Sequence, residues 1–113
     1  MADQNVYRRL QIGGWKELPF EPFRTGVEIH MLREGEPALA LLRYQQGASV
    51  PAHLHPDVET ILVLEGSQSD DAGTYNAGDF VINQPGSSHR VWSDDGCVVL
   101  ISWSKPVEFL AVE

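Results

Sequence analysis

Cysteine and long apolar runs are almost absent from this sequence. Cys97 is its only cysteine, so an internal disulfide is excluded. No stretch approaches the roughly 18 apolar residues that mark a membrane-spanning helix. Residues 1–14 lack the apolar centre of a signal peptide. Together these absences favour a cytoplasmic protein in a reducing compartment.

Basic residues are also scarce. Eight lysines and arginines stand against sixteen aspartates and glutamates, which gives a formal charge of −8 at pH 7. Nucleic acids and anionic membrane surfaces both repel such a chain, so neither is expected as a partner. The charge favours a small-molecule ligand or substrate instead. At 113 residues the chain has room for one domain with a hydrophobic core.

A sustained helical pattern is missing as well. No segment keeps apolar residues at i, i+3, i+4 and i+7 for more than about ten residues. Short apolar or alternating stretches are separated instead by clusters of glycine, proline, asparagine and aspartate. This pattern predicts an all-β protein, either a sandwich or a barrel-like jelly roll. The predicted strands span residues 27–32, 38–44, 50–55, 60–65, 79–83, 89–93, 97–103 and 107–112.

The N-terminal part, residues 1–26, carries no strong strand pattern. We interpret it as an arm or an edge strand in front of a barrel formed by residues 27–113. Small β proteins must cover their edge strands, and adding a strand to a partner's sheet is one way to do so. We therefore expect a homodimer.

One run has the spacing H-x-H-x-x-x-E within a region that reads as two strands. Side chains alternate faces along a strand, so His53 and His55 project from the same face. Glu59 lies across the next turn. Three side chains in this arrangement can share one metal ion.

A further histidine, His89, follows the turn at Pro85-Gly86. Gly86 can adopt the positive φ that a type II turn needs, and His89 then begins the next strand. Three imidazoles and one carboxylate suit zinc, iron, manganese, nickel or copper, and the ligand type alone does not choose among these divalent metals. We expect zinc or iron, with manganese, nickel or copper as alternatives. Magnesium and calcium prefer oxygen ligands. His30 stands alone in a predicted edge strand and is interpreted as a non-ligand.

The run from Gly47 to Gly66, with the spacing G-x5-H-x-H-x3-E-x6-G, resembles the first motif of the cupin superfamily position for position. The second cupin motif usually reads G-x5-P-x-G-x2-H-x3-N. This chain keeps its glycines and histidine, has the proline one place late and has serine for asparagine: Gly78, Pro85, Gly86, His89 and Ser93.

A narrower resemblance is to the cupin-like domain of ChrR-type anti-sigma factors and its stand-alone relatives. It covers roughly residues 38–103, and this chain has Asp57, Val58 and Thr60 where that group commonly has two glycines and a second acid. The matching positions are Leu62 to Gly66, Asp70 to Gly73, Tyr75, Pro85 to His89 and Gly96-Cys97.

The resemblance implies a double-stranded β-helix, or jelly-roll barrel, with a divalent metal held by His53, His55, Glu59 and His89. Cupins include dioxygenases, isomerases, sugar-binding proteins and sensors, so the fold does not decide the function. The anti-sigma relatives grip their sigma factor with an additional N-terminal helical domain. We expect this chain to have no residues to spare for one, and sigma-factor binding is therefore not expected to transfer.

Three functions stay open at this point. A metal with an open position can bind an enolised β-diketone, a hydroxy-ketone or a carboxylate, and with iron also O₂, which favours a dioxygenase that cleaves a C–C bond. The second is a non-catalytic metal or ligand sensor. The third is a cupin whose zinc is structural and saturated. We place the enzyme ahead of the sensor.

Strand alternation also limits which residues can line a pocket. In the predicted strand 97–103 one alternating set begins with Cys97 and the other with Val98, and either can face the cavity. We interpret Cys97 as a small buried side chain and not a nucleophile. Arg43 either binds a substrate anion or lies outside. The pocket candidates are Arg43, Tyr44, Trp92 and Trp103, although aromatic residues in strands more often belong to the core.

Overall fold

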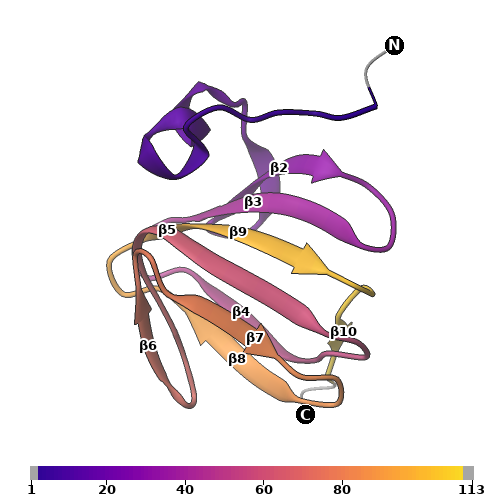
Figure 1. Cartoon of the computed structure of the whole chain (residues 1–113). Helices are drawn as coiled ribbons and strands as arrows, with labels where there is room; N and C mark the ends of the chain where they lie inside the picture. Colours follow the sequence, from indigo (N-terminus) through magenta and orange to yellow (C-terminus); the bar gives the residue numbers. More distant parts are fainter. Residues whose placement is uncertain (1–2, 111–113) are drawn as a thin grey trace.

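The protein forms a curled antiparallel sheet preceded by two short 3₁₀ helices (Figure 1). The structure, a computed structural model, describes residues 3–110. The helices are η1 (Leu10–Ile12) and η2 (Gly14–Glu17). The strands are β1 (Glu21–Arg24), β2 (Val27–Arg33), β3 (Ala38–Tyr44), β4 (Ser49–Leu54), β5 (Glu59–Asp70), β6 (Gly73–Asn76), β7 (Phe80–Asn83), β8 (Ser88–Trp92), β9 (Cys97–Trp103) and β10 (Glu108–Phe109).

The long strand β5 joins two layers of this sheet. Its first half pairs with β9 and β7, next to β3, β2 and β1. Its second half, beyond Gly66, pairs with β6 and β8 in the layer that also holds β4 and β10. The two layers face each other, so the predicted all-β jelly roll is confirmed. Among residues 3–110, no helix is long and apolar enough to cross a membrane.

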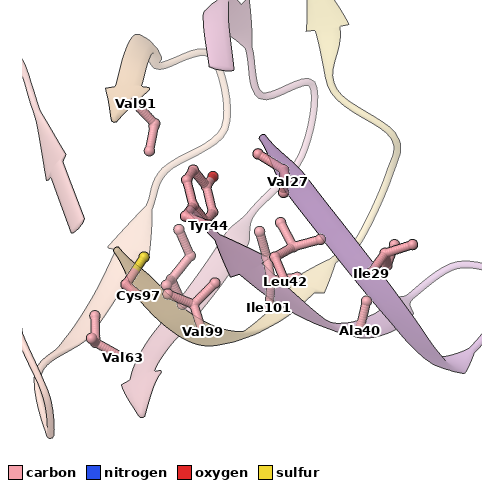
Figure 2. Packing of buried hydrophobic residues seen from close by; sticks show 11 residues of the cluster. Val27, Ile29, Ala40, Leu42, Tyr44, Val63, Val91, Cys97, Val99 and Ile101 are labelled. Carbon is pink, nitrogen blue, oxygen red and sulfur yellow. The ribbon is translucent and has the colours of Figure 1, made fainter. Parts of the chain in front are cut away.

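The core lies between the layers, and β9 shows which face is inside. Cys97, Val99 and Ile101 pack against residues of β3 and β5 in this core (Figure 2). The other set, Val98 and Leu100, packs on the outer side of the sheet with Trp15 of η2. Each buried valine, leucine or isoleucine contributes about 1.5–3 kcal/mol through the hydrophobic effect. The set that begins with Cys97 therefore faces the interior.

Several elements differ from the predicted strands. β1 and β6 are additional strands, and β5 continues for five residues beyond the predicted end at residue 65. Because β1 pairs with β2, the strand that holds His30 is not an edge strand. At the C-terminal end, β10 occupies only Glu108–Phe109 of the predicted strand 107–112, and residues 111 and 112 lie outside the described residues.

Candidate metal centre

Two neighbouring strands bring His53 and His89 together. β4 and β8 are antiparallel, and these two residues are partners in their register. His55 follows β4 directly, and its N–H donates to the Ser87 carbonyl at 2.9 Å while its carbonyl accepts from the Gly86 N–H at 2.7 Å. Gly86 has a φ of 85°, the positive value that the turn before β8 requires. This turn therefore positions His55 beside the other two histidines.

Glu59 reaches the histidines from the first layer. It begins β5, where it is paired with Asn83 of β7 and Trp103 of β9. The side-chain amide of Asn83 donates to Glu59 Oε1 at 3.0 Å, which orients the carboxylate. The same oxygen lies 3.3 Å from His55 Nε2. The glutamate is thus buried against the imidazoles and held by a neighbouring strand.

The four side chains converge on one point. One ligand atom from each of them lies within 4.8 Å of the others. The centres of the three imidazole rings are 4.7–5.1 Å apart. His53, His55 and Glu59 are buried, and the His89 side chain is 9% exposed. The structure therefore forms a compact N₃O cluster from three separate strands or strand ends.

Hydrogen bonds fix the orientation of His53 and His89. His53 Nδ1 is 2.8 Å from the Pro51 carbonyl oxygen, and His89 Nδ1 is 3.0 Å from Asp70 Oδ2. A carbonyl and a carboxylate only accept, so Nδ1 carries the proton in both rings. In the neutral imidazole, Nε2 is then the nitrogen with the lone pair, which is the form that binds a metal.

Ser87 places the proton of His55 on Nδ1 in the same way. The Ser87 hydroxyl donates to the Gln84 carbonyl at 2.6 Å, so its oxygen accepts from His55 Nδ1 at 3.0 Å. Among the residues that the structure describes, Nε2 of His55 and Nε2 of His89 are buried and have no hydrogen-bond partner. Burying such an atom unsatisfied costs about 1–3 kcal/mol. A metal ion at the centre of the cluster would satisfy both nitrogens, so the residues present fit a transition metal.

The electrostatic environment acts on His53 and on Asp70, the partner of His89. Burial lowers the pKa of His53, which favours the neutral imidazole. At Asp70, burial alone raises the pKa, but hydrogen bonds from His89, Tyr75 and the Ala72 N–H outweigh it, so the net pKa lies below the usual range. Burial and the hydrogen bond to Asp70 raise the pKa of Tyr75 to about 12. Asp70 is therefore an ionised acceptor behind His89.

A cavity of about 80 Å³ adjoins the cluster, and His53 and Glu59 form part of its wall. Two of the predicted pocket residues, Tyr44 and Trp103, also line it, together with aliphatic side chains of both layers. A larger hollow of about 490 Å³ lies on the outer side of the sheet beside the N-terminal segment and contains none of the four cluster residues. The small cavity is thus the one next to the candidate ligands.

Family comparison agrees with this geometry. The model of the ChrR cupin-like domain matches residues 10–106. This chain belongs to the ChrR cupin-like family. The anti-sigma-E factor ChrR of Cereibacter sphaeroides is 33% identical over 107 residues, which covers 92% of this chain and 48% of the relative. The chain thus spans about half the length of the curated relative it matches.

Solved structures show the same fold as this ChrR-type cupin. The complex of Rhodobacter sphaeroides SigE with the anti-sigma ChrR has a TM-score of 0.73 and 28% identity, over 85% of this chain and 52% of that chain. An acetylacetone dioxygenase from Acinetobacter johnsonii has a TM-score of 0.80 over 98% of this chain and 80% of that chain. Its 15% identity shows likeness of fold alone. The family resemblance inferred from the motifs is confirmed.

Two predicted pocket residues of this ChrR-type cupin do not line the cavity. Arg43 lies between the inward-facing Leu42 and Tyr44, so it points outward, where its guanidinium pairs with Glu28 at 2.8 Å. Trp92 follows the inward-facing Val91 and is not part of the cavity wall. Cys97 is buried, and burial raises its pKa to about 11, which agrees with a core side chain.

Sequence reasoning missed three residues at the mouth of the cavity. Phe23 and Arg24 come from β1 and Phe109 comes from β10. β1 contains Pro22 and shows no apolar alternation, so nothing local identified it as a strand. It reaches the site only because it pairs with β2. Asp70 likewise lies outside the predicted strands, and its contact with His89 depends on long-range pairing.

Asp70→Asn is expected to lower the metal affinity of this ChrR-type cupin by roughly 10–100-fold, the effect typical of an outer hydrogen-bond partner. Asparagine keeps the shape but removes the charge that holds the Nδ1 proton of His89. Competition with a chromogenic chelator measures the change. Asp71→Asn, on the next residue and exposed, is the matched control and should leave the affinity within about two-fold. Equal losses in both variants would contradict the role given to Asp70.

Proposed function

We propose that this chain is a metal-dependent cupin dioxygenase that cleaves a C–C bond of a small chelating substrate. The observation that supports it is the cavity: His53 and Glu59 belong both to the N₃O cluster and to the cavity wall. A structural zinc site is saturated and closed, whereas a catalytic site keeps an open position. A cavity beside the ligands favours the open position over a structural metal.

The residues of the site define what it can bind. His53, His55, Glu59 and His89 would hold the metal, and three neutral imidazoles with one carboxylate leave a divalent ion with a net charge near +1. This charge favours an anionic chelate such as an enolised β-diketone. A bound ferrous ion would supply O₂ activation, whereas zinc would supply only charge and polarisation.

The cavity wall adds selection by size and polarity. Leu42, Ile61 and Val91 give it an apolar surface that excludes water from a bound chelate. A volume of about 80 Å³ suits a small substrate, with any larger part of the molecule lying at the mouth. Small, weakly hydrated dicarbonyl compounds fit this description.

A metal or ligand sensor is the second candidate function. The 33% identity to the anti-sigma-E factor ChrR favours it, because a cupin domain in that protein is joined to a longer chain. In a sensor, loss or occupation of the metal would change the affinity for a protein partner such as a sigma factor. The two functions differ in whether the metal-loaded protein turns over a substrate.

The test starts from protein purified without added metal, which we expect to contain about one transition-metal ion per chain. Protein loaded anaerobically with ferrous iron should then consume O₂ with 2,4-pentanedione, at one O₂ per diketone cleaved. Zinc-loaded protein is the control and should consume none. No uptake by protein shown to hold ferrous iron, across a panel of β-dicarbonyl compounds, would overturn the enzyme and favour the sensor.

A further inference from the structure

Among residues 3–110, Arg24 is the only arginine or lysine in the wall of the cavity beside the metal cluster. It ends β1, and its guanidinium lies 4.7 Å from the centre of the Phe109 ring, which belongs to β10. The two strands that carry these side chains lie at opposite ends of the sheet order and meet over the cavity. A cation is thus held at the mouth by an aromatic face.

No carboxylate of residues 3–110 pairs with Arg24. Arg43 provides the contrast, because its guanidinium forms two hydrogen bonds to Glu28 on the outer face. A half-buried guanidinium that contacts a ring leaves its planar set of N–H donors for another acceptor. Its donor geometry matches a carboxylate, which accepts two such bonds at once.

The charge of Arg24 also reaches the interior of the cavity. Burial raises the pKa of Tyr44, the positive charge of Arg24 opposes this rise, and the negative charge of Glu59 adds to it. All three residues line the same cavity. The positive charge of Arg24 is therefore felt inside the cavity, whose wall also includes His53 and Glu59 of the candidate metal cluster.

We infer that Arg24 binds a carboxylate of the ligand, so that the preferred ligand is a small dicarbonyl compound that also carries an acid group. The inference rests on the proposed metal site, because the dicarbonyl end would chelate the metal while the carboxylate meets Arg24. The preferred class of ligand is therefore a dioxo acid, and Arg24 is the residue that distinguishes such an acid from an uncharged diketone. Because the net charge of the chain is −8, a cation beside the site offsets the repulsion that a second negative group on the ligand would meet.

Calorimetry on the zinc-loaded protein tests this with two probes, 2,4-dioxopentanoate and its methyl ester. They share the dicarbonyl skeleton and differ in the negative charge. The acid should bind the wild type at least about ten-fold more tightly, or about 1.4 kcal/mol. Arg24→Gln should lower the affinity for the acid by about ten-fold and for the ester by less than about two-fold. Arg43→Gln, the matched control on the outer face, should change neither.

Arg24→Lys keeps the charge and the packed stem but loses the planar fork, and an affinity for the acid between those of wild type and Arg24→Gln is expected. Each variant should retain about one zinc ion per chain, which shows that the metal site is intact. Unchanged affinity of both Arg24 variants for the acid, equal losses for acid and ester, or no preference of the wild type for the acid would overturn the inference.

A second readout separates this inference from the proposed function. If the wild type holds no metal, the proposed function fails, and Arg24 is then tested in the metal-free protein. The side-chain Nε–H signal of Arg24 in a nitrogen-15 spectrum should shift on addition of 2,4-dioxopentanoate and not on addition of the ester. An unmoved signal would overturn the role of Arg24 independently of the metal.

Discussion

His89→Ala is expected to abolish stoichiometric metal binding, with less than about 0.1 metal ion per chain after purification. The reason is that Nε2 of His89 is a buried ring nitrogen of the cluster that has no hydrogen-bond partner and can bind the metal through its lone pair. Losing an outer hydrogen-bond partner already costs roughly 10–100-fold in affinity, and losing a ligand should exceed that. His53→Ala should have the same effect, because His53 is the partner of His89 in the β4–β8 register.

Elemental analysis of the purified variants measures this result, and thermal unfolding with and without a chelator gives a second readout. A metal present at about 1,000 times its dissociation constant stabilises the native state by about 4 kcal/mol. Chelation should therefore lower the melting temperature of the wild type and leave that of His89→Ala unchanged.

The control is His30→Ala. His30 lies on β2, away from the cluster, and its Nδ1 donates to the Pro19 carbonyl at 2.8 Å. This variant should keep about one metal ion per chain. A full metal content in both His53→Ala and His89→Ala would rule out the four-ligand site.

The candidate ligands could be predicted from the sequence in part because their spacing is local. Alternation along one strand places His53 and His55 together without any knowledge of the fold. The approach of His89 to His53 depends on the register of β4 and β8, which residue spacing does not encode. The turn at Pro85-Gly86 predicted His89 as the fourth ligand and the second family motif supported it, but only the structure shows the register that brings it beside His53.

The second half of β5 shows why part of the fold could not be predicted. Ser67, Gln68, Ser69 and Asp70 form a polar run that reads as a loop, yet all four residues are buried. They can be buried because hydrogen bonds satisfy them, as when the hydroxyls of Ser69 and Thr74 meet at 2.8 Å. Partners that belong to other strands cannot be seen in a local pattern.

The two arginines near the site illustrate the same limit. Arg43 stands in a clear strand, and its outward direction follows once Leu42 and Tyr44 are known to face the core. Arg24 ends a short strand that contains a proline and shows no alternation, so no local signal placed it at the cavity. The homodimer and the cytoplasmic location, which were inferred from composition and edge strands, stay predictions.

Gly66→Ala is expected to destabilise the fold by about 4 kcal/mol or more, a loss that few single substitutions reach. Gly66 has a φ of 73°, and a Cβ there would lie 2.0 Å from the Gly96 carbonyl oxygen. The backbone at Gly96, directly before β9, must therefore shift where β5 passes from one layer to the other. The strain of a non-glycine residue at positive φ adds about 1–3 kcal/mol.

Gly47→Ala is the matched control for this substitution, because it separates the conformational strain from the steric clash. Gly47 is the first glycine of the motif that Gly66 ends and has a φ of 82°, but a Cβ there would meet no atom within 4 Å. It should lose only about 1–2 kcal/mol. Urea unfolding monitored by tryptophan fluorescence measures both variants. Equal losses would show that the contact with Gly96 relaxes freely, whereas the larger loss expected for Gly66→Ala would show that this glycine fixes the bend of the strand that begins with Glu59.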